Sequence, residues 1–168
     1  MISTKLHWVD GIWPGRLALA ARPRGGDWLA DEIANWRSNG IDTVLSLLTA
    51  EEEKDLDITD EAAQVKAHGM NFLSFPIIDR QVPESESNLA RILEELDTEL
   101  ASGRNVVLHC RQGIGRTGLV AACLMLTKGL DPEMVVTRLS AARGVPVPET
   151  LEQRRWIDRY ASTFAGTR

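Results

Sequence analysis

The chain has 168 residues with a formal net charge of −5, and 43% of its residues are hydrophobic. This length and composition are typical of one globular domain, so we expect residues 1–168 to form a single folded unit. The negative charge argues against a protein that binds nucleic acid through bulk electrostatics, and no apolar run near the N-terminus indicates a secretory signal or a membrane span.

Apolar periodicity and turn residues divide the chain into alternating strands and helices. In chain order, the sequence predicts a strand at 16–20, a helix at 27–39, a strand at 41–48, a helix at 59–68, a strand at 71–75, a helix at 87–102, a strand at 105–109, and helices at 119–126, 132–142 and 149–164. This alternation predicts an α/β fold, a three-layer sandwich with a mainly parallel central sheet flanked by helices. The acidic run Glu51 to Glu53 fits the first turn of a further, solvated helix and needs no ligand to explain it.

A glycine-rich loop after the strand at 105–109 carries a cysteine and an arginine six positions apart. Backbone N–H groups are left unpaired where a helix begins, which makes such a loop a suitable site for an anion. Gly113 and Gly115 permit backbone angles that bring several amides into one concave nest. A helix N-terminus and a nearby guanidinium also favour a thiolate, so we expect Cys110 to be a nucleophile at neutral pH.

We expect this loop to surround a phosphoryl group. The predicted phosphate ligands are Arg111, Gln112, Gly113, Ile114, Gly115 and Arg116. Arg116 can donate a bidentate pair of hydrogen bonds to two phosphoryl oxygens, a geometry that lysine cannot reproduce. The transition state of phosphoryl transfer spreads charge over these oxygens, so preorganised donors stabilise it more than they stabilise free substrate.

The leaving oxygen of a phosphate ester needs a proton, and Asp79 is the candidate donor. It follows the predicted strand at 71–75 and lies between Pro76 and Pro83, on a stiffened loop at a strand end. As a general acid it should raise the rate about 10²–10⁴-fold, first by protonating the leaving oxygen and then by activating water. The alternative role for Asp79 is an Asx-type turn.

The run HCRQGIGRT at 109–117 resembles the signature of the cysteine-dependent protein tyrosine phosphatase superfamily, which is His-Cys, five variable residues, Arg, and Ser or Thr. The likeness is strongest to the small dual-specificity phosphatases, because the chain is short and carries Trp8, PGRLA at 14–18 and PIID at 76–79. The resemblance extends over about residues 8–160, although only the signature and the acid motif are specific.

This resemblance implies a phosphoric monoester hydrolase that acts through a cysteinyl-phosphate intermediate, as a protein tyrosine or dual-specificity phosphatase. By the same likeness, Cys110 is the nucleophile, Arg116 clamps the phosphate and Asp79 is the acid. Thr117 would ease departure of the thiolate through its hydroxyl, and His109 would brace the loop from behind.

The segment PETLEQ at 148–153 resembles the Glu-Thr-x-x-Gln segment that some small members carry on their last helix. Gln153 would then be a supporting residue that, like Glu149, approaches the site and positions water. Both residues also have ordinary interpretations, Glu149 in the first turn of a helix and Gln153 as a polar surface residue.

Several arginines lie near the predicted site in the sequence. Arg22 and Arg24, in a turn-rich loop, would either help to hold an acidic partner or be solvated. Arg80, Arg111 and Arg143 have better claims from their positions, and Arg111 contributes its backbone amide whatever its side chain does.

Other interpretations of the same residues are weaker. Gly113, Gly115 and Gly118 also match the dinucleotide-binding fingerprint, but Arg138 occupies the place of the expected acidic residue and too few residues follow. Cys110 would otherwise be a buried structural cysteine, which is the role we expect for Cys123, and we expect no disulfide between the two.

The expected partner is a phosphorylated protein or peptide, with no nucleic acid and no membrane, and we take the chain to be a monomer. The scattered histidines His7, His68 and His109 give no metal motif, so we expect no metal and no cofactor. A cysteine that must stay reduced fits the cytoplasm. The alternatives are a phosphatase for a phosphoinositide, a nucleotide or an RNA 5′ phosphate, and a silent phosphopeptide-binding module.

Overall fold

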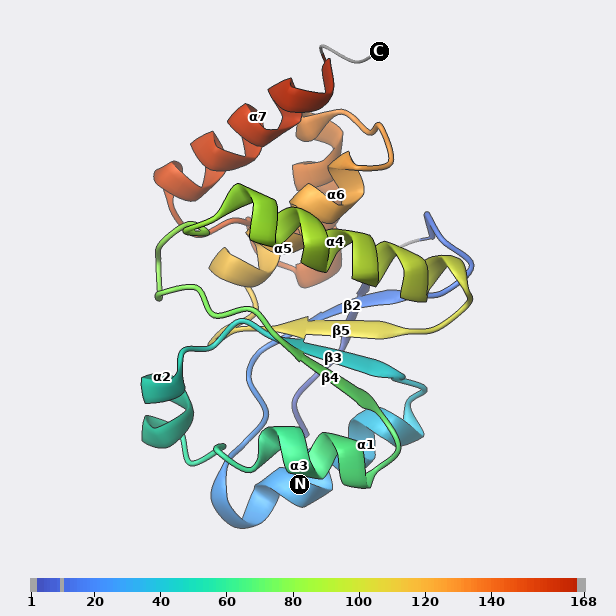
Figure 1. Ribbon diagram of the computed structural model, residues 1–168, viewed down its shortest axis with the longest axis vertical. Helices are drawn as coiled ribbons and strands as arrows, with labels where there is room; N and C mark the ends of the chain where they lie inside the picture. The colour runs from blue at the N-terminus through green and yellow to red at the C-terminus, as the bar shows by residue number, and fades with distance from the viewer. Residues whose placement is uncertain (1–2, 10, 166–168) are drawn as a thin grey trace.

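In the part of the chain that the structure describes, residues 3–9 and 11–165, the computed structural model contains a five-stranded sheet with helices on both faces (Figure 1). The strands are β1 (His7–Val9), β2 (Leu17–Ala20), β3 (Thr43–Ser46), β4 (Asn71–Ser74) and β5 (Val106–His109), and their order across the sheet is β1-β2-β5-β3-β4. β1 is antiparallel to β2, and the other neighbouring strands are parallel. The predicted α/β sandwich with a mainly parallel sheet is confirmed.

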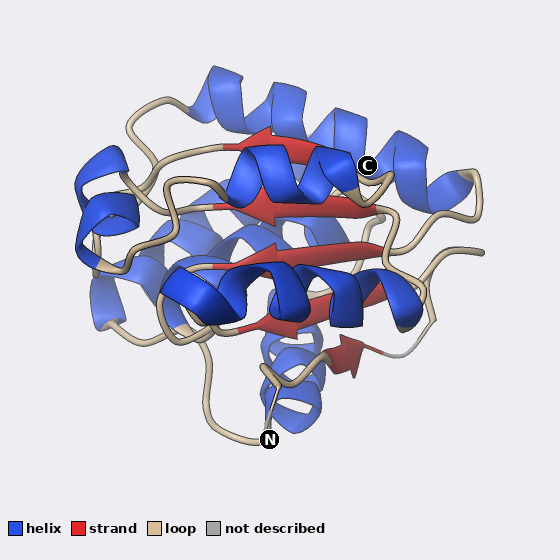
Figure 2. Ribbon diagram, turned by 90° about the horizontal axis from the view of Figure 1, so that it is seen from below, coloured by secondary structure: helices blue, strands red, loops and turns tan. Residues whose placement is uncertain are grey.

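The helices form a layer on each side of the sheet (Figures 1 and 2). A short 3-10 turn, Gly26–Trp28, leads into α1 (Leu29–Ser38), which covers one face together with α3 (Glu61–Ala67). The other face is covered by α4 (Glu86–Ala101), α5 (Gly115–Leu126), α6 (Pro132–Arg143) and α7 (Leu151–Ala165). The short helix α2 (Ala50–Asp55) lies beyond the end of the sheet toward which β5 points.

Strand side chains alternate between two apolar cores, as expected for a sheet that is covered on both faces. In β2, Leu17 and Leu19 join the core under α4 to α7, whereas Ala18 and Ala20 join the core under α1 and α3. Every residue of α5 is buried. Its first turn is therefore held firmly beside the end of β5.

Three differences from the predicted elements have physical causes. The sequence does not predict β1, because its three residues form no apolar run, and the strand forms by pairing Trp8 with Ala18. α5 begins at Gly115 and not at 119, since its first turn carries no apolar periodicity. The strand predicted at 41–48 ends at Ser46, although Leu47 and Leu48 are buried in the loop that follows.

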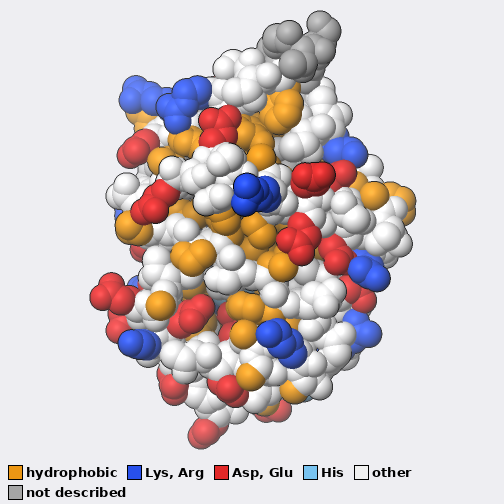
Figure 3. All heavy atoms as spheres, in the orientation of Figure 1, with side chains coloured by type: hydrophobic (Ala, Val, Ile, Leu, Met, Phe, Trp, Pro, Cys, Tyr) orange, Lys and Arg blue, Asp and Glu red, His pale blue; other side chains and the backbone are white. Residues whose placement is uncertain are grey.

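Acidic and basic side chains are interspersed on the face of the molecule shown in Figure 3. On that face, neither sign of charge gathers into a broad field. Within residues 3–9 and 11–165, no helix has the length and the apolar character needed to cross a membrane.

Candidate active site

The predicted site begins directly after the central strand β5, which lies between β2 and β3. We call residues 110–116 the Cys110 loop. Cys110 is 3% exposed and unpaired, and the loop ends in the first turn of α5. No backbone N–H from Arg111 to Thr117 donates to an acceptor within the described part of the chain, and the N-cap Ile114 makes no side-chain cap. Such a row of amides at a helix N-terminus is suited to an anion.

A close approach to β2 explains the first glycine of the loop. Gly113 has φ of +72°, and a Cβ there would lie 2.4 Å from the carbonyl oxygen of Ala20. Only glycine fits both the left-handed backbone and this contact without a shift of the chain. The glycine therefore fixes the path of the Cys110 loop against the strand behind it.

Arg116 is almost wholly buried, with 1% of its surface exposed, and is held mainly by a carboxylate from α2. Its Nη1 and Nη2 donate to Oε1 and Oε2 of Glu52 at 2.7 and 2.9 Å, and Nη1 also donates to the Ile77 carbonyl at 2.8 Å. The prediction that the Glu51 to Glu53 run is merely solvated is wrong for Glu52, which is buried. The capping-box pattern from Thr49 to Glu52 was the available signal, since it indicates a side chain folded back on the helix start.

The pair of Glu52 and Arg116 stays charged despite its burial. Desolvation raises the pKa of Glu52, but hydrogen bonds from Arg116 and Thr49 and the charge of Arg116 outweigh it, so the pKa lies below its ordinary value. Burial lowers the pKa of Arg116, and the hydrogen bonds that Arg116 donates to Glu52, with the charges of Cys110, Glu52 and Asp79, more than reverse this. A buried, permanent cation thus lies at the end of the Cys110 loop.

Asp79 contacts the Cys110 loop through Arg116. Its Oδ1 accepts a hydrogen bond from Arg116 Nη2 at 3.1 Å, and its side chain is 48% exposed. Asp79 is the second residue of a turn, which we call the Asp79 turn (Ile78 to Gln81), closed by Gln81 N donating to the Ile78 carbonyl at 2.9 Å. The structure therefore brings together the three residues that the sequence predicts to be catalytic.

His109 and Thr117 lie behind the loop and are fully buried. His109 Nε2 lies 2.6 Å from Oε2 of Glu61 on α3, and its Nδ1 lies 3.3 Å from the Cys110 carbonyl oxygen. This placement suits the bracing role expected of His109, and it adds Glu61, which no motif in the sequence indicates. The Thr117 hydroxyl has no hydrogen-bond partner among the described residues.

Gln153 is completely buried, so its interpretation as a surface residue is wrong. Its Oε1 accepts from the backbone N–H groups of Glu149 and Thr150 at 3.2 and 3.1 Å, and its Nε2 donates to the Gln81 carbonyl at 3.1 Å. Glu149 precedes α7 and pairs with Arg80 of the Asp79 turn. The start of α7 therefore contacts the turn that carries the candidate acid.

Two further arginines, one inside the Cys110 loop and one outside it, hold the loop in place. Arg111 Nε donates to Oε2 of Glu52 at 3.1 Å, so the side chain in the loop shares the carboxylate that holds Arg116. Arg143, at the end of α6, donates to the carbonyls of Gly113 and Gln112 at 3.2 and 2.8 Å. Arg143 thereby provides donors for these two carbonyl oxygens, whereas the N–H groups of residues 111–117 have no acceptor among the described residues.

The arginines before α1 have structural contacts. The backbone N–H of Arg22 donates to the Arg111 carbonyl at 3.1 Å, which joins this segment to the Cys110 loop. Arg24 pairs with the buried carboxylate of Glu32 at 3.1 Å and lies over the Trp28 ring. Arg24 is therefore not simply solvated.

Cys123 is a free, buried cysteine inside α5, as predicted, and neither cysteine forms a disulfide. Burial and the charge of Glu86 raise the pKa of its thiol well above the ordinary value. Its side chain is therefore a neutral part of the core. Within the described residues, no group of three His, Cys, Asp or Glu side chains is placed to hold a metal ion.

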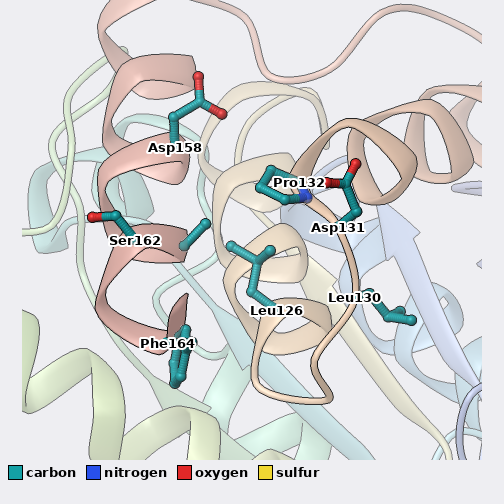
Figure 4. A pocket seen from close by; sticks show the side chains of 8 residues that line it. Leu126, Leu130, Asp131, Pro132, Asp158, Ser162 and Phe164 are labelled. Atoms are coloured by element: carbon teal, nitrogen blue, oxygen red, sulfur yellow. The ribbon is translucent and has the colours of Figure 1, made fainter. Parts of the chain in front are cut away.

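A pocket away from these residues lies between the end of α5, the start of α6 and the end of α7 (Figure 4). Leu126, Pro132 and Phe164 give it an apolar wall, and Asp131 and Asp158 lie at its rim. It contains none of the residues that the sequence predicts to act in catalysis.

Comparison with known proteins finds relatives across most of the chain. The family described as polymorphic toxin system, DSP-PTPase phosphatase, matches residues 18–130. Cyclin-dependent kinase inhibitor 3 of Rattus norvegicus is 29% identical over 131 residues, which cover 77% of this chain and 61% of that protein. The chain therefore spans less than two thirds of the length of this relative.

Solved structures share the fold over nearly the whole chain. Kinase associated phosphatase, crystallised with its catalytic site cysteine replaced by serine, matches with a TM-score of 0.90 at 23% identity over 98% of both chains. PTPMT1 in complex with PI(5)P matches with a TM-score of 0.74 at 18% identity, over 95% of this chain and 98% of that one. At these identities the likeness shows a common architecture.

Proposed function

Because the chain belongs to the dual-specificity and tyrosine phosphatase (DSP-PTPase) family, we propose that it hydrolyses phosphoric monoesters of phosphorylated proteins or peptides through a cysteinyl-phosphate intermediate. The observation that carries the proposal is the contact between Asp79 and Arg116 at 3.1 Å. It joins a candidate acid to the Cys110 loop across 37 positions of sequence. One chain supplies all three catalytic residues, so a monomer suffices.

Substrate binding needs donors on Arg116 that its protein partners do not already use. A guanidinium has five N–H groups, one on Nε and two on each Nη nitrogen. Glu52 and the Ile77 carbonyl engage both N–H groups of Nη1, and Glu52 and Asp79 engage both of Nη2. A bidentate contact to phosphate therefore uses Nε–H and the Nη2–H that Asp79 releases.

In the first step, the Cys110 thiolate attacks phosphorus, the S–P bond forms and the ester P–O bond breaks. The amides of the Cys110 loop and Arg116 stabilise the charge on the three remaining phosphoryl oxygens. The protonated carboxyl of Asp79 gives its proton to the leaving oxygen, which departs as an alcohol or phenol.

In the second step, the Asp79 carboxylate takes a proton from water as the water oxygen attacks phosphorus. The S–P bond breaks, inorganic phosphate leaves and the Cys110 thiolate is restored. We propose that the Thr117 hydroxyl donates to the departing sulfur, that His109 positions the loop through the Cys110 carbonyl, and that Gln153 supports the Asp79 turn.

The charge of the loop favours a peptide over a polyanionic lipid. Arg111 is the cation among the variable loop positions, and it is paired with Glu52. A phosphoinositide headgroup with several phosphates gains less from a cation that is already neutralised. Because both cysteines are free and the proposed nucleophile works only when reduced, we infer a reducing compartment such as the cytoplasm.

The proposal is tested by turnover of para-nitrophenyl phosphate and of a phosphopeptide in the presence of a metal chelator. We expect turnover by the wild-type chain, and its loss in Cys110→Ser with phosphopeptide binding retained. A panel of phosphoinositides run beside the peptide distinguishes the substrate classes. Peptide binding by the wild-type chain without any turnover would contradict the proposal and favour a binding module.

A further inference from the structure

Contacts that use neither Arg116 nor the backbone amides of the Cys110 loop hold the Asp79 turn in place. Its third residue, Arg80, has φ of +65°, a left-handed conformation that favours glycine or asparagine. Because a side chain disfavours this backbone, the turn needs support from its surroundings. The support comes from two residues at the start of α7.

Glu149 and Gln153 hold the turn by its side chain and by its backbone. Arg80 Nη1 lies 2.5 Å from Glu149 Oε1, and Gln153 Nε2 donates to the Gln81 carbonyl at 3.1 Å. Gln153 also accepts the backbone N–H of Glu149, so the two contacts belong to one rigid segment.

The same segment lies against the first turn of α5. A Cβ on Gly115 would be 3.0 Å from Gln153 Oε1 and 3.0 Å from Glu149 Oε2. Glu149 and Gln153 therefore touch both the Asp79 turn and the end of the Cys110 loop. They thus link the turn that carries the candidate acid to the loop that carries the nucleophile.

This link is needed when substrate binds. In the free chain Asp79 is held by Arg116 Nη2, the donor that a bound phosphate takes over. Once that contact is lost, the contacts of Arg80 and Gln81 with the start of α7 remain to hold the turn. We propose that Arg80 and Glu149 are positioning residues that keep Asp79 over the leaving oxygen during proton transfer, an inference that rests on the proposed function.

The test compares a substrate whose leaving group needs a proton with one whose leaving group does not. If Glu149 positions the acid, its substitution should affect only the first. Glu149→Gln removes the ion pair, and Glu152→Gln, an exposed glutamate in the first turn of α7, is the matched control. A phosphoserine peptide needs protonation of its leaving alkoxide, whereas a dinitrophenyl phosphate releases a stable phenolate. We expect kcat for the peptide to fall about threefold to fivefold in Glu149→Gln, as for loss of an exposed ion pair. KM for the peptide should stay unchanged, as should the rate constant for the pre-steady-state burst of dinitrophenolate, which reports the first step alone and needs no acid.

A charge swap separates the ion pair from the shape of the side chains. Arg80→Glu should lower kcat for the peptide further than Glu149→Gln does, because it places two carboxylates together. Adding Glu149→Arg to Arg80→Glu should restore most of this loss. The single and the double variant both carry Glu at position 80, so the left-handed backbone there costs the same free energy in each.

An Asp79→Asn background separates failure of this inference from failure of the proposed function. In that background Glu149→Gln should cause no further loss, because the group that it positions is absent. If Cys110→Ser keeps turnover, or Asp79→Asn leaves the peptide rate unchanged, the proposed function is wrong. Suppose that Cys110→Ser and Asp79→Asn behave as expected. The positioning role alone is then overturned if Glu149→Gln changes kcat for the peptide no more than Glu152→Gln does, or if it lowers kcat further in the Asp79→Asn background.

Discussion

At the scale of single residues, the site is organised around the buried guanidinium of Arg116, which donates hydrogen bonds to four oxygen atoms. Glu52 supplies two of them, and the Ile77 carbonyl and Asp79 supply the others. Removing one partner from a buried charge pair costs more than the pair itself contributes, because the remaining charge stays desolvated. We therefore expect the burial of the Arg116 charge to depend on Glu52 as well as on the Cys110 loop.

We predict that Glu52→Gln lowers the free energy of unfolding by about 2 kcal/mol at neutral pH, the worth of hydrogen bonds to a charged group. The pKa of Glu52 is lowered in the folded chain, so its contribution is complete above the ordinary value of 4.5 and is lost as the pH falls through the folded-state pKa. The difference between wild type and variant should therefore shrink on acidification.

Urea unfolding at a series of pH values measures this difference. Glu51→Gln is the matched control, since that glutamate is exposed on the same helix. A constant difference across the acidic range, or an equal effect of Glu51→Gln, would contradict the charge pairing described above.

The residues of the site differ in how far the sequence could predict them. Cys110, Arg116 and the loop glycines follow one another closely, so local spacing carries their chemistry. Glu52 and Glu61 come from separate helices. Glu52 contacts Arg116 of the loop, and Glu61 contacts His109 behind it, only because the fold brings α2 and α3 to the end of β5. A contact over 64 positions has no local pattern, apart from the capping box that folds Glu52 back.

At the scale of elements, the junction of β5 and α5 decides the geometry of the site. The strand pattern at 105–109 matches β5 closely, because its apolar residues are bounded by turn signals. The start of α5 could not be predicted as well, since glycine and polar residues fill its first turn. There the close approach of Gly113 to Ala20 and the packing of Gly115 on α7 fix the backbone, and both are tertiary contacts.

We predict that Gly113→Ala destabilises the chain more than Gly103→Ala does. Both glycines have positive φ, so each alanine should cost about 1–2 kcal/mol of unfolding free energy for the left-handed backbone. A Cβ at Gly103 meets nothing within 4 Å, whereas at Gly113 it meets the Ala20 carbonyl at 2.4 Å. Gly113→Ala should also weaken binding of vanadate, a phosphate analogue, and Gly103→Ala should not. Equal effects of the two variants on both measurements would show that the contact with β2 is unimportant.

At the scale of the whole molecule, two cores on opposite faces of one sheet hold the site rigid. Predicting the layers from the sequence was possible because long apolar helices and strands alternate. The edge strand β1 escaped prediction, since a three-residue strand acquires its conformation from pairing with β2. The larger core continues through α5 into α7, where Tyr160 stacks on Trp156 and meets Phe164 edge-on.

Tyr160 gives a whole-molecule prediction because it is the single tyrosine of the chain. Burial, with a smaller effect of the charge of Glu86, raises its pKa from 10.0 to about 12. The neutral phenol is favoured in the folded state, so its stabilisation is complete below pH 10.0 and is lost as the pH rises through the folded pKa of about 12.

Ultraviolet absorbance of tyrosinate should therefore rise near pH 12 in the native chain and near pH 10 in urea. The free energy of unfolding should fall over the same interval. A native titration at the ordinary tyrosine value would contradict the packing of α7 on α5 described above.

The central claim is that Cys110 carries the phosphoryl group during turnover. In Asp79→Asn mixed with a dinitrophenyl phosphate, the first step needs no acid and the second lacks its base, so the intermediate should accumulate. Mass spectrometry after acid quenching should then find one phosphoryl group on Cys110, with the buried Cys123 unmodified. Continued turnover with no phosphoryl group on Cys110 would contradict the account.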